Sequence, residues 1–154
     1  MTIRDYRSAD FERLLAIDQA AFAPELAYSR YELRTYLSGR RSRTLVAEGA
    51  DGAAVGFVVG RLAAGRVGYL ITLDVAPGHQ GSGIGGRLLA AIERWLEESG
   101  ARGVALHTPA DSAGARRFYE RHGYRALDRL AGYYHGRLDA FLMLKRLGPE
   151  GGEP

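Results

Sequence analysis

The fold is decided by residues 73–86, which read Leu73-Asp74-Val75-Ala76-Pro77-Gly78-His79-Gln80-Gly81-Ser82-Gly83-Ile84-Gly85-Gly86. After this stretch the apolar residues take the spacing of one helix face, and the pattern ends at Gly100. Glycines let several backbone N–H groups approach one anion, and the start of a helix adds the positive end of its dipole. The stretch therefore predicts a strand, a phosphate-binding turn and a long helix from Ile84.

Both strands and helices are expected on each side of this turn. Before it, residues 2–6 indicate a strand, and helices follow after Ser8 and from Ser29, where Ser29 and Glu32 have the spacing of a capping box. Turn residues separate strands at 44–48, 54–62 and 67–75, which favours an antiparallel meander. After the glycines come a strand at 103–108, a helix at 112–122, and strands at 124–130 and 138–147. This order, β-α-α-β-β-β-α-β-α-β-β, predicts an α/β (α+β) fold with a mixed central sheet of about seven strands.

Length and composition narrow the class of protein. With 154 residues, 46% of them hydrophobic, the chain is expected to form a single domain over residues 1–147, followed by a disordered tail at 148–154. The absence of cysteine excludes disulfides, thiolate metal sites and an enzyme-cysteine acyl intermediate, and we expect no metal site. The net charge of +3 is spread along the chain, so no nucleic-acid partner is expected. No signal peptide or membrane partner is expected either, and the chain is predicted to be cytoplasmic, as a monomer or homodimer.

Three classes of anion site compete for the glycine turn, beside the simpler alternative of a flexible connection. A P-loop requires Lys and then Ser or Thr after its last glycine, whereas Gly86 and Arg87 follow Gly85 here. The letters Gly81-x-Gly83-x-x-Gly86 match the dinucleotide fingerprint, but that site also needs an acidic residue about 20 positions later. The next strand ends in Leu106-His107-Thr108 and carries no carboxylate there.

The third class is the GNAT acetyltransferase family, whose pyrophosphate loop has the form Gln/Arg-x-x-Gly-x-Gly/Ala. The segment Gln80-Gly81-Ser82-Gly83-Ile84-Gly85 resembles this loop at every position. Residues 111–124 are similar to the family's Ser-Asn-x-x-Ala-x-x-x-Tyr-x-x-x-Gly-Phe block, and the element order is that of the GNAT fold. The resemblance covers essentially the whole domain and implies an acetyl-CoA-dependent N-acetyltransferase.

The resemblance also implies which residues hold acetyl-CoA. Backbone groups of Leu73, Asp74 and Val75 are expected to contact the pantetheine arm and the thioester carbonyl. The pyrophosphate is then held by the turn residues Gln80, Gly81, Ser82, Gly83, Ile84, Gly85 and Gly86. Ser112 stands where the family usually has Asn, which removes an amide contact to the cofactor, although Ser112 can still cap a helix.

Three residues are predicted to carry the chemistry. Tyr119 occupies the position of the family's tyrosine that faces the cofactor sulfur, and a phenol with a pKa of ~10 suits an acid for a thiolate of pKa ~8.5. His107 stands where N-terminal-amine acetyltransferases, including those that modify a ribosomal protein, carry Glu or His as a base. Tyr69 resembles a tyrosine that cooperates with this histidine in some of them. As alternatives, Tyr119 and Tyr69 are packing residues and His107 is a surface histidine at a strand end.

The acceptor groove is predicted from aromatic residues. Tyr133 and Tyr134, expected in a loop between strands, resemble the paired tyrosines that line the groove of the N-terminal acetyltransferases. Phe22 and Tyr28, between the first two helices, would form the opposite wall. The acceptor is therefore expected to be a protein or peptide N-terminal α-amine. A small amine (an amino acid, polyamine or aminoglycoside) is the alternative, and a non-catalytic acyl-CoA-binding module is a third hypothesis.

Overall fold

The computed structural model describes residues 1–148, so the tail predicted at 148–154 lies outside the described residues except for Gly148, and the domain boundary at 147 stays a prediction. The elements follow the expected order, with short 3-10 turns at Ser8–Asp10 and Ala64–Arg66. The helices are α1 Phe11–Ala21, α2 Arg30–Leu37, α3 Ile84–Glu98 and α4 Ala113–Arg121. The strands are β1 Thr2–Asp5, β2 Ser42–Glu48, β3 Ala54–Leu62, β4 Val67–Val75, β5 Gly103–Pro109, β6 Arg125–Tyr134 and β7 Leu138–Arg146.

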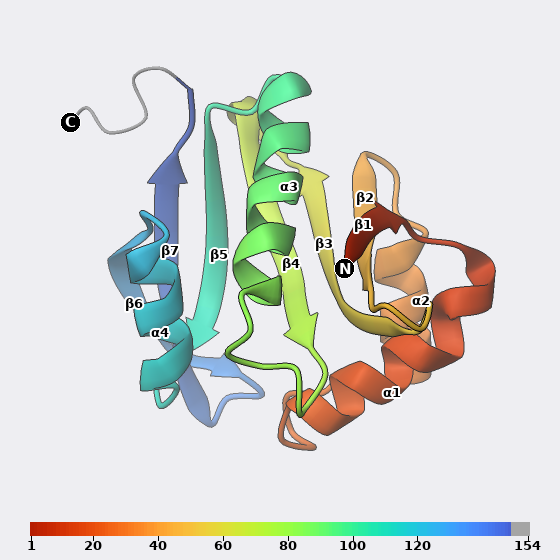
Figure 1. Ribbon diagram of the computed structural model, residues 1–154. Coiled ribbons are helices and arrows are strands. Elements are labelled where there is room, and N and C mark those ends of the chain that lie inside the picture. Colours follow the sequence, from red (N-terminus) through yellow and green to blue (C-terminus); the bar gives the residue numbers. More distant parts are fainter. Residues whose placement is uncertain (149–154) are drawn as a thin grey trace.

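The seven strands lie in one sheet with the order β1-β2-β3-β4-β5-β7-β6 (Figure 1). All neighbouring strands are antiparallel except β4 and β5, which are parallel because α3 returns the chain to the same end of the sheet. The expected antiparallel meander is formed by β2, β3 and β4. The structure therefore confirms the mixed sheet and the fold class.

Two apolar cores cover the two faces of the sheet. On one face, α3 packs Leu88, Leu89 and Ile92 against a core that includes Val58 of β3. On the other face, α1 and α2 pack against a core that includes Phe57 of β3. Because both faces of β3 are covered, seven consecutive residues of that strand are buried.

Two local predictions have different outcomes. The capping box of α2 is confirmed, since Ser29 Oγ accepts the Glu32 N–H at 3.1 Å and Glu32 Oε1 accepts the Ser29 N–H at 2.9 Å. The expectation that Tyr133 and Tyr134 lie in a loop is wrong. They end β6, because Tyr134 pairs with Leu138 of β7 across a tight turn.

The central strand β4 creates an opening in the sheet. Leu70 and Thr72 pair with consecutive residues of β3, so Ile71 between them is an extra residue that forms a bulge. On its other side, β4 pairs with β5 only from Val67 to Tyr69. Beyond Tyr69 the two strands diverge, as their lower ends show in Figure 1.

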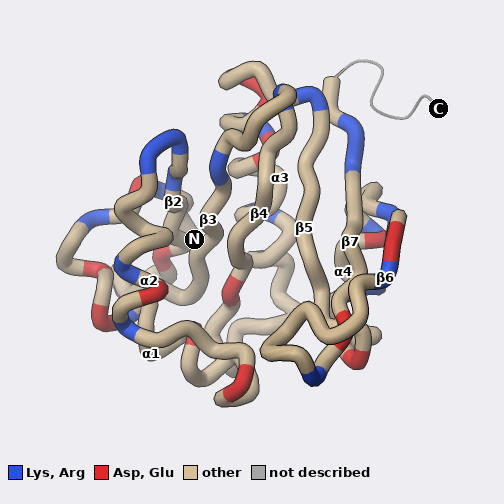
Figure 2. Tube along the Cα trace, turned by 180° about the vertical axis from the view of Figure 1, so that it is seen from behind, with Lys and Arg blue, Asp and Glu red and all other residues tan. Residues whose placement is uncertain are grey.

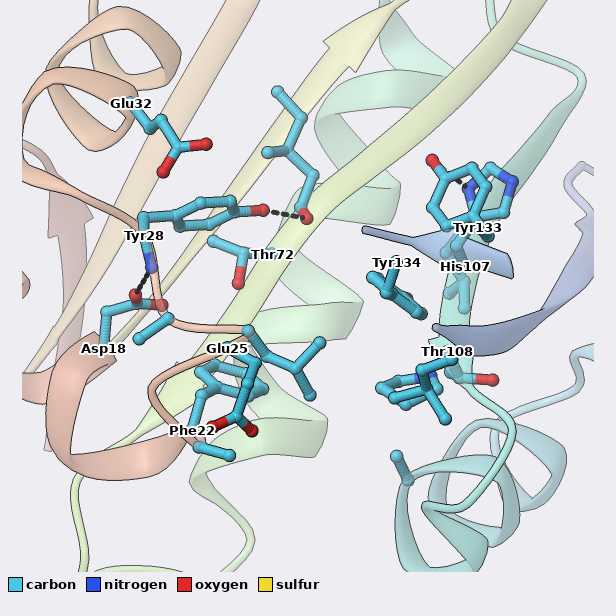
Figure 3. Close-up of a pocket in the computed structure, with 18 of the residues that line it drawn as sticks. Asp18, Phe22, Glu25, Tyr28, Glu32, Thr72, His107, Thr108, Tyr133 and Tyr134 are labelled. Carbon is cyan, nitrogen blue, oxygen red and sulfur yellow. Dashed lines mark hydrogen bonds between the residues drawn. The ribbon is translucent and has the colours of Figure 1, made fainter. Parts of the chain in front are cut away.

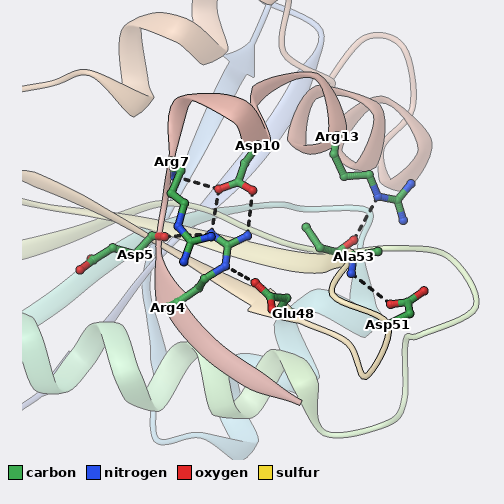
Figure 4. Close-up of polar contacts among 9 residues, drawn as sticks. Arg4, Asp5, Arg7, Asp10, Arg13, Glu48, Asp51 and Ala53 are labelled. Carbon is green, nitrogen blue, oxygen red and sulfur yellow. Dashed lines mark hydrogen bonds and ion pairs between the residues drawn. The ribbon is translucent and has the colours of Figure 1, made fainter.

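A polar network ties the first strand to its neighbours. The Arg4 guanidinium donates to Asp10 at 2.9 and 2.8 Å and also to Glu48 of β2 (Figure 4). Asp10 further accepts the backbone N–H of Arg7 at 2.8 Å. The network holds the four-residue edge strand β1 against the turn that begins α1.

Charged residues are spread over the described surface. Lys and Arg positions lie among Asp and Glu positions around the sheet (Figure 2). Within residues 1–148, no helix combines the length and apolar character that a membrane crossing requires.

Candidate active site

A cleft with a volume of about 1470 Å³ lies where β4 and β5 diverge. The segment between α1 and α2 forms one wall with residues 70–73 of β4, and residues 106–109 of β5 with the β6–β7 hairpin form the other (Figure 3). Tyr119 of α4 also lines the cleft. The cleft thus gathers side chains from elements distant in the sequence around the gap in the sheet.

The glycine turn lies at the start of α3 and is exposed. Gly81 and Gly83 have φ angles of 79° and 87°, in the left-handed region that favours glycine. Gly83 is the N-cap of α3, and among residues 1–148 no side chain caps the helix there. The N–H groups of the first helical turn are therefore left for a ligand, as in an anion site at a helix N-terminus.

Other residues of the glycine turn stabilise the conformation of the loop before α3. Gln80 Nε2 donates to the Val75 carbonyl at 3.1 Å, and Ser82 Oγ donates to the His79 carbonyl. A Cβ on Gly86 would lie 3.0 Å from His122 Nε2, so this glycine lets the end of α4 approach the first turn of α3. The turn fits a pyrophosphate because its backbone is open while its side chains support the loop from within.

The backbone of β4 points alternately toward β3 and toward the gap. The Ala76 N–H donates to the Val55 carbonyl of β3 at 2.8 Å, so by alternation the backbone of Asp74 also faces β3. The N–H groups of Leu73 and Val75 then face the gap, where no strand pairs with them among the described residues. Of the three residues expected to offer backbone groups to the cofactor, the geometry suits Leu73 and Val75 and does not suit Asp74.

His107 lies between two of the predicted tyrosines. The Tyr69 hydroxyl is 2.5 Å from His107 Nδ1, and the Tyr133 hydroxyl is 3.4 Å from the same nitrogen. The Tyr133 ring stacks on the imidazole, with ring centroids 4.3 Å apart and planes at 12°. These residues come from β4, β5 and β6, and His107 lies two residues before the end of β5 rather than at it.

Burial sets the protonation state of this cluster. It lowers the pKa of His107 below its ordinary value, so the imidazole is neutral at neutral pH. It raises the pKa of Tyr69, so the phenol keeps its proton. A neutral imidazole joined to a protonated phenol can accept a proton from a group in the cleft.

Tyr119 lies within α4, and Ser112 lies at the start of this helix. Tyr119 is 9% exposed, and burial together with the nearby Asp74 raises its pKa above that of a free phenol. Tyr119 therefore stays protonated and is a hydrogen-bond donor rather than a strong acid. Ser112 is the N-cap of α4, and its Oγ accepts the Ala115 N–H at 3.4 Å.

Aromatic side chains form the two walls of the cleft. Phe22 and Tyr28 lie on one side and Tyr133 and Tyr134 on the other (Figure 3). The Tyr28 hydroxyl donates to the carbonyl of the bulge residue Ile71 at 3.2 Å, which fixes this wall to β4. The structure thus brings all four predicted groove residues into the same cleft.

One cleft residue escaped the sequence reasoning. Asp18 of α1 lines the cleft although it is only 1% exposed, and its Oδ2 accepts the Tyr28 N–H at 2.7 Å. Its one sequence signal is its place on the apolar face of α1, four residues after the buried Leu14 and seven after the buried Phe11. Asp74 of β4 is equally buried.

Comparisons with known proteins agree with this geometry. Residues 5–124 match the acetyltransferase (GNAT) family model. An uncharacterized N-acetyltransferase of Methanocaldococcus jannaschii is 33% identical over 95% of this chain and 92% of its own length. An aminoglycoside N(6')-acetyltransferase of Stenotrophomonas maltophilia is 31% identical over 64% of this chain and 70% of its own. An N-alpha-acetyltransferase of Sulfurisphaera tokodaii is 26% identical over 92% and 90%.

The structural comparison gives the same fold. The ribosomal-protein-S18-alanine N-acetyltransferase of Escherichia coli superposes with a TM-score of 0.85 at 24% identity, covering 99% of this chain and 97% of that one. The chain belongs to the acetyltransferase (GNAT) family. It is an N-acetyltransferase, and its acyl donor is acetyl-CoA.

Proposed function

We propose that the chain transfers the acetyl group to the α-amine of a protein or peptide N-terminus. The observation that carries this proposal is the arrangement of the cleft, with Tyr28 facing Tyr133 and Tyr134 across a gap that ends at His107 and Tyr69. Small-molecule pockets usually measure about 300–1,000 Å³. The larger cleft, about 1470 Å³, has room for the cofactor arm and the first residues of an extended chain.

The match with the N-alpha-acetyltransferase of Sulfurisphaera tokodaii, which spans almost the whole chain, also favours a peptide acceptor. An N-terminal residue held between the tyrosines would place its backbone against β4 and its α-nitrogen beside the histidine cluster. Any part of the unpaired β4 backbone that the cofactor does not occupy offers such a segment hydrogen bonds that do not depend on its side chains.

When bound, acetyl-CoA supplies an acetyl thioester at the gap between β4 and β5. The first turn of α3 would hold its pyrophosphate, and the N–H groups of Leu73 and Val75 would bind along its pantetheine arm and thioester carbonyl. An N–H at the carbonyl oxygen stabilises the negative charge that develops there during acyl transfer. These assignments agree with the open, uncapped helix start and the unpaired strand edge.

His107 and Tyr69 act as one basic unit in this proposal. The amine must lose a proton as its nitrogen forms a bond to the acetyl carbon and the carbon–sulfur bond breaks. The Tyr69 hydroxyl receives this proton while it passes its own to His107 Nδ1, 2.5 Å away. After the relay Tyr69 is again a neutral phenol, and His107 carries the proton and returns it to solvent.

Tyr119 acts at the sulfur. Because burial raises the pKa of its phenol, the proton remains on Tyr119 until negative charge develops on the departing thiolate. Its hydrogen bond stabilises that charge, the proton passes to coenzyme A as it leaves, and solvent then returns a proton to Tyr119.

A cationic small molecule is the second candidate acceptor. Glu25 and Glu32 line the cleft beside Asp18, and one relative is named as an aminoglycoside acetyltransferase. One oxygen of Glu32 already accepts the Ser29 N–H in the capping box, which holds this carboxylate in place at the start of α2.

Initial rates of coenzyme A release test the proposal. The acceptors are a peptide with a free N-terminus and no lysine, the same peptide with a blocked N-terminus and one lysine, an aminoglycoside and a polyamine. The free N-terminus is expected to give the highest kcat/KM, by about tenfold or more, a difference of ~1.4 kcal/mol in transition-state stabilisation. A higher value for the aminoglycoside or polyamine would assign the cleft to the second candidate.

A further inference from the structure

Asp18 of α1 and Asp74 of β4 form a pair of buried carboxyl groups behind one wall of the cleft, and each is 1% exposed. One oxygen of each is hydrogen-bonded, because Asp18 Oδ2 accepts the Tyr28 N–H at 2.7 Å and Asp74 Oδ1 accepts the Thr72 hydroxyl at 2.5 Å. The other oxygens, Asp18 Oδ1 and Asp74 Oδ2, are buried and have no donor among the described residues.

A single proton accounts for both of these oxygens. Asp18 is the neighbouring side chain that raises the pKa of Asp74, and within residues 1–148 neither carboxyl group forms an ion pair with Arg, Lys or His. Two carboxylates buried side by side repel each other, so such pairs retain one proton between them. A proton on Asp74 Oδ2, donated to Asp18 Oδ1, would satisfy both atoms at once.

We propose that Asp18 and Asp74 share one proton at neutral pH and act as positioning residues that hold the acceptor wall of the cleft against β4. This proposal rests on the assignment of that wall to the acceptor. Neither carboxyl group is placed at the reacting atoms: the pair acts through Tyr28 and β4, and Asp74 also interacts electrostatically with Tyr119.

The shared proton completes a closed path of hydrogen bonds. Asp74 of β4 bonds to Asp18 of α1, Asp18 accepts the Tyr28 N–H, and the Tyr28 hydroxyl returns to β4 at the Ile71 carbonyl. The bulge residue and the buried pair thus secure the same wall at two points. Loss of the proton would set two buried charges against each other and weaken the first of these attachments.

The groups around the pair do not supply a compensating charge. Tyr28 and Tyr119 also interact electrostatically with Asp74, and burial raises the pKa of both so that they stay neutral. The α2 residue Tyr36 contacts the Tyr28 ring, and β3 places the apolar Phe57 opposite Asp74. Burial and the neighbouring Asp18 both raise the pKa of Asp74 well above its ordinary value.

The shared proton is tested first on the wild-type chain without substrate, so the result does not depend on which amine is acetylated. Infrared spectroscopy at neutral pH is expected to show the C=O stretching band of a protonated carboxyl group. The band is expected to disappear in Asp74→Asn and to remain in the control Asp51→Asn, which removes an exposed turn carboxylate. Its absence from the wild-type spectrum would overturn the proposal, even if the chain acetylates α-amines.

The positioning role is tested by measuring the KM of the acceptor and the KM of acetyl-CoA over a range of pH. The acceptor is the best one of the panel. The acceptor KM of the wild type is expected to rise about tenfold in alkaline solution, the effect of losing one charge-assisted hydrogen bond. Asp74→Asn is expected to keep a low acceptor KM throughout, because its amide donates to Asp18 and cannot ionise. The proposal would be overturned if the acceptor KM of the wild type did not rise in alkaline solution. It would also be overturned if the acceptor KM of Asp74→Asn rose as much as that of the wild type.

A disruptive variant provides the complementary result. Asp18→Ala removes the acceptor for both the Tyr28 N–H and the Asp74 proton. Its acceptor KM is expected to be about tenfold higher at every pH, while the acetyl-CoA KM changes by less than about twofold. Equal increases in both KM values would assign the pair to general stability and contradict a positioning role.

Discussion

Replacing Tyr69 by Phe removes one oxygen atom from the proposed basic unit and leaves the aromatic ring in place. The lost hydroxyl is the 2.5 Å partner of His107 Nδ1, and only the Tyr133 hydroxyl remains near that nitrogen, at 3.4 Å. A hydrogen bond that supports a group as it becomes charged contributes about 1.5–3 kcal/mol. At ~1.4 kcal/mol per factor of ten, kcat/KM is expected to fall about 10- to 100-fold.

The assay is steady-state coenzyme A release with a free-N-terminus peptide, together with thermal unfolding of the variant. Tyr31→Phe is the matched control, because Tyr31 is 80% exposed on α2 and loses the same atom far from His107. Both variants are expected to unfold near the wild-type temperature. If kcat/KM of Tyr69→Phe stayed within about twofold of the control, which is under ~0.5 kcal/mol, the relay through Tyr69 would be refuted.

Three further changes test other parts of the structure. Tyr119→Phe is expected to lower kcat about 10- to 100-fold with little change in the acetyl-CoA KM, because the donor to the leaving thiolate is lost; unchanged kcat in steady-state assays would place that donor elsewhere. Gly83→Ala forces a side chain into a φ of 87°, at a cost of about 1–2 kcal/mol, and is expected to weaken calorimetric acetyl-CoA binding. Gly114→Ala, in open space without a positive φ, is its control, and equal affinity in the two variants would count against the cradle. Arg4→Gln is expected to lower the free energy of unfolding by about 1–2 kcal/mol in urea titrations at neutral pH. Hydrogen bonding to Arg4 lowers the pKa of Asp10, so this difference should shrink as the pH falls through that lowered value, and a pH-independent difference would exclude the ion pair as its cause.

Local signals made much of the fold predictable. The helix starts at Ile84 as expected, because the glycines before it and the apolar period after it act over only a few residues. The capping box at Ser29 and the turn at Asp51-Gly52 are equally local. The end of β6 was misjudged because Tyr133 and Tyr134 extend the strand only through pairing with β7, which the sequence of that segment does not specify.

The parts of the site that one segment forms could be predicted from the sequence. The parts that form where several segments meet could not. The residues of the glycine turn act together because they are consecutive. By contrast, the contact between Tyr69 and His107 depends on the register of β4 and β5 near the point where they diverge. The bulge at Ile71 and the Asp18–Asp74 pair require β3, β4 and α1 to be assembled, so no period or spacing within one element indicates them.

Acetylation of an α-amine is the activity proposed for the cleft, and localisation of the product by tandem mass spectrometry tests it most directly. The enzyme and acetyl-CoA are mixed with two peptides of one sequence that contains an internal lysine, one with a free and one with a blocked N-terminus. The expected result is an acetyl group on the α-nitrogen of the free peptide, with the blocked peptide unmodified. Acetylation of the lysine side chain in both peptides, with the α-nitrogen left free, would contradict the assignment.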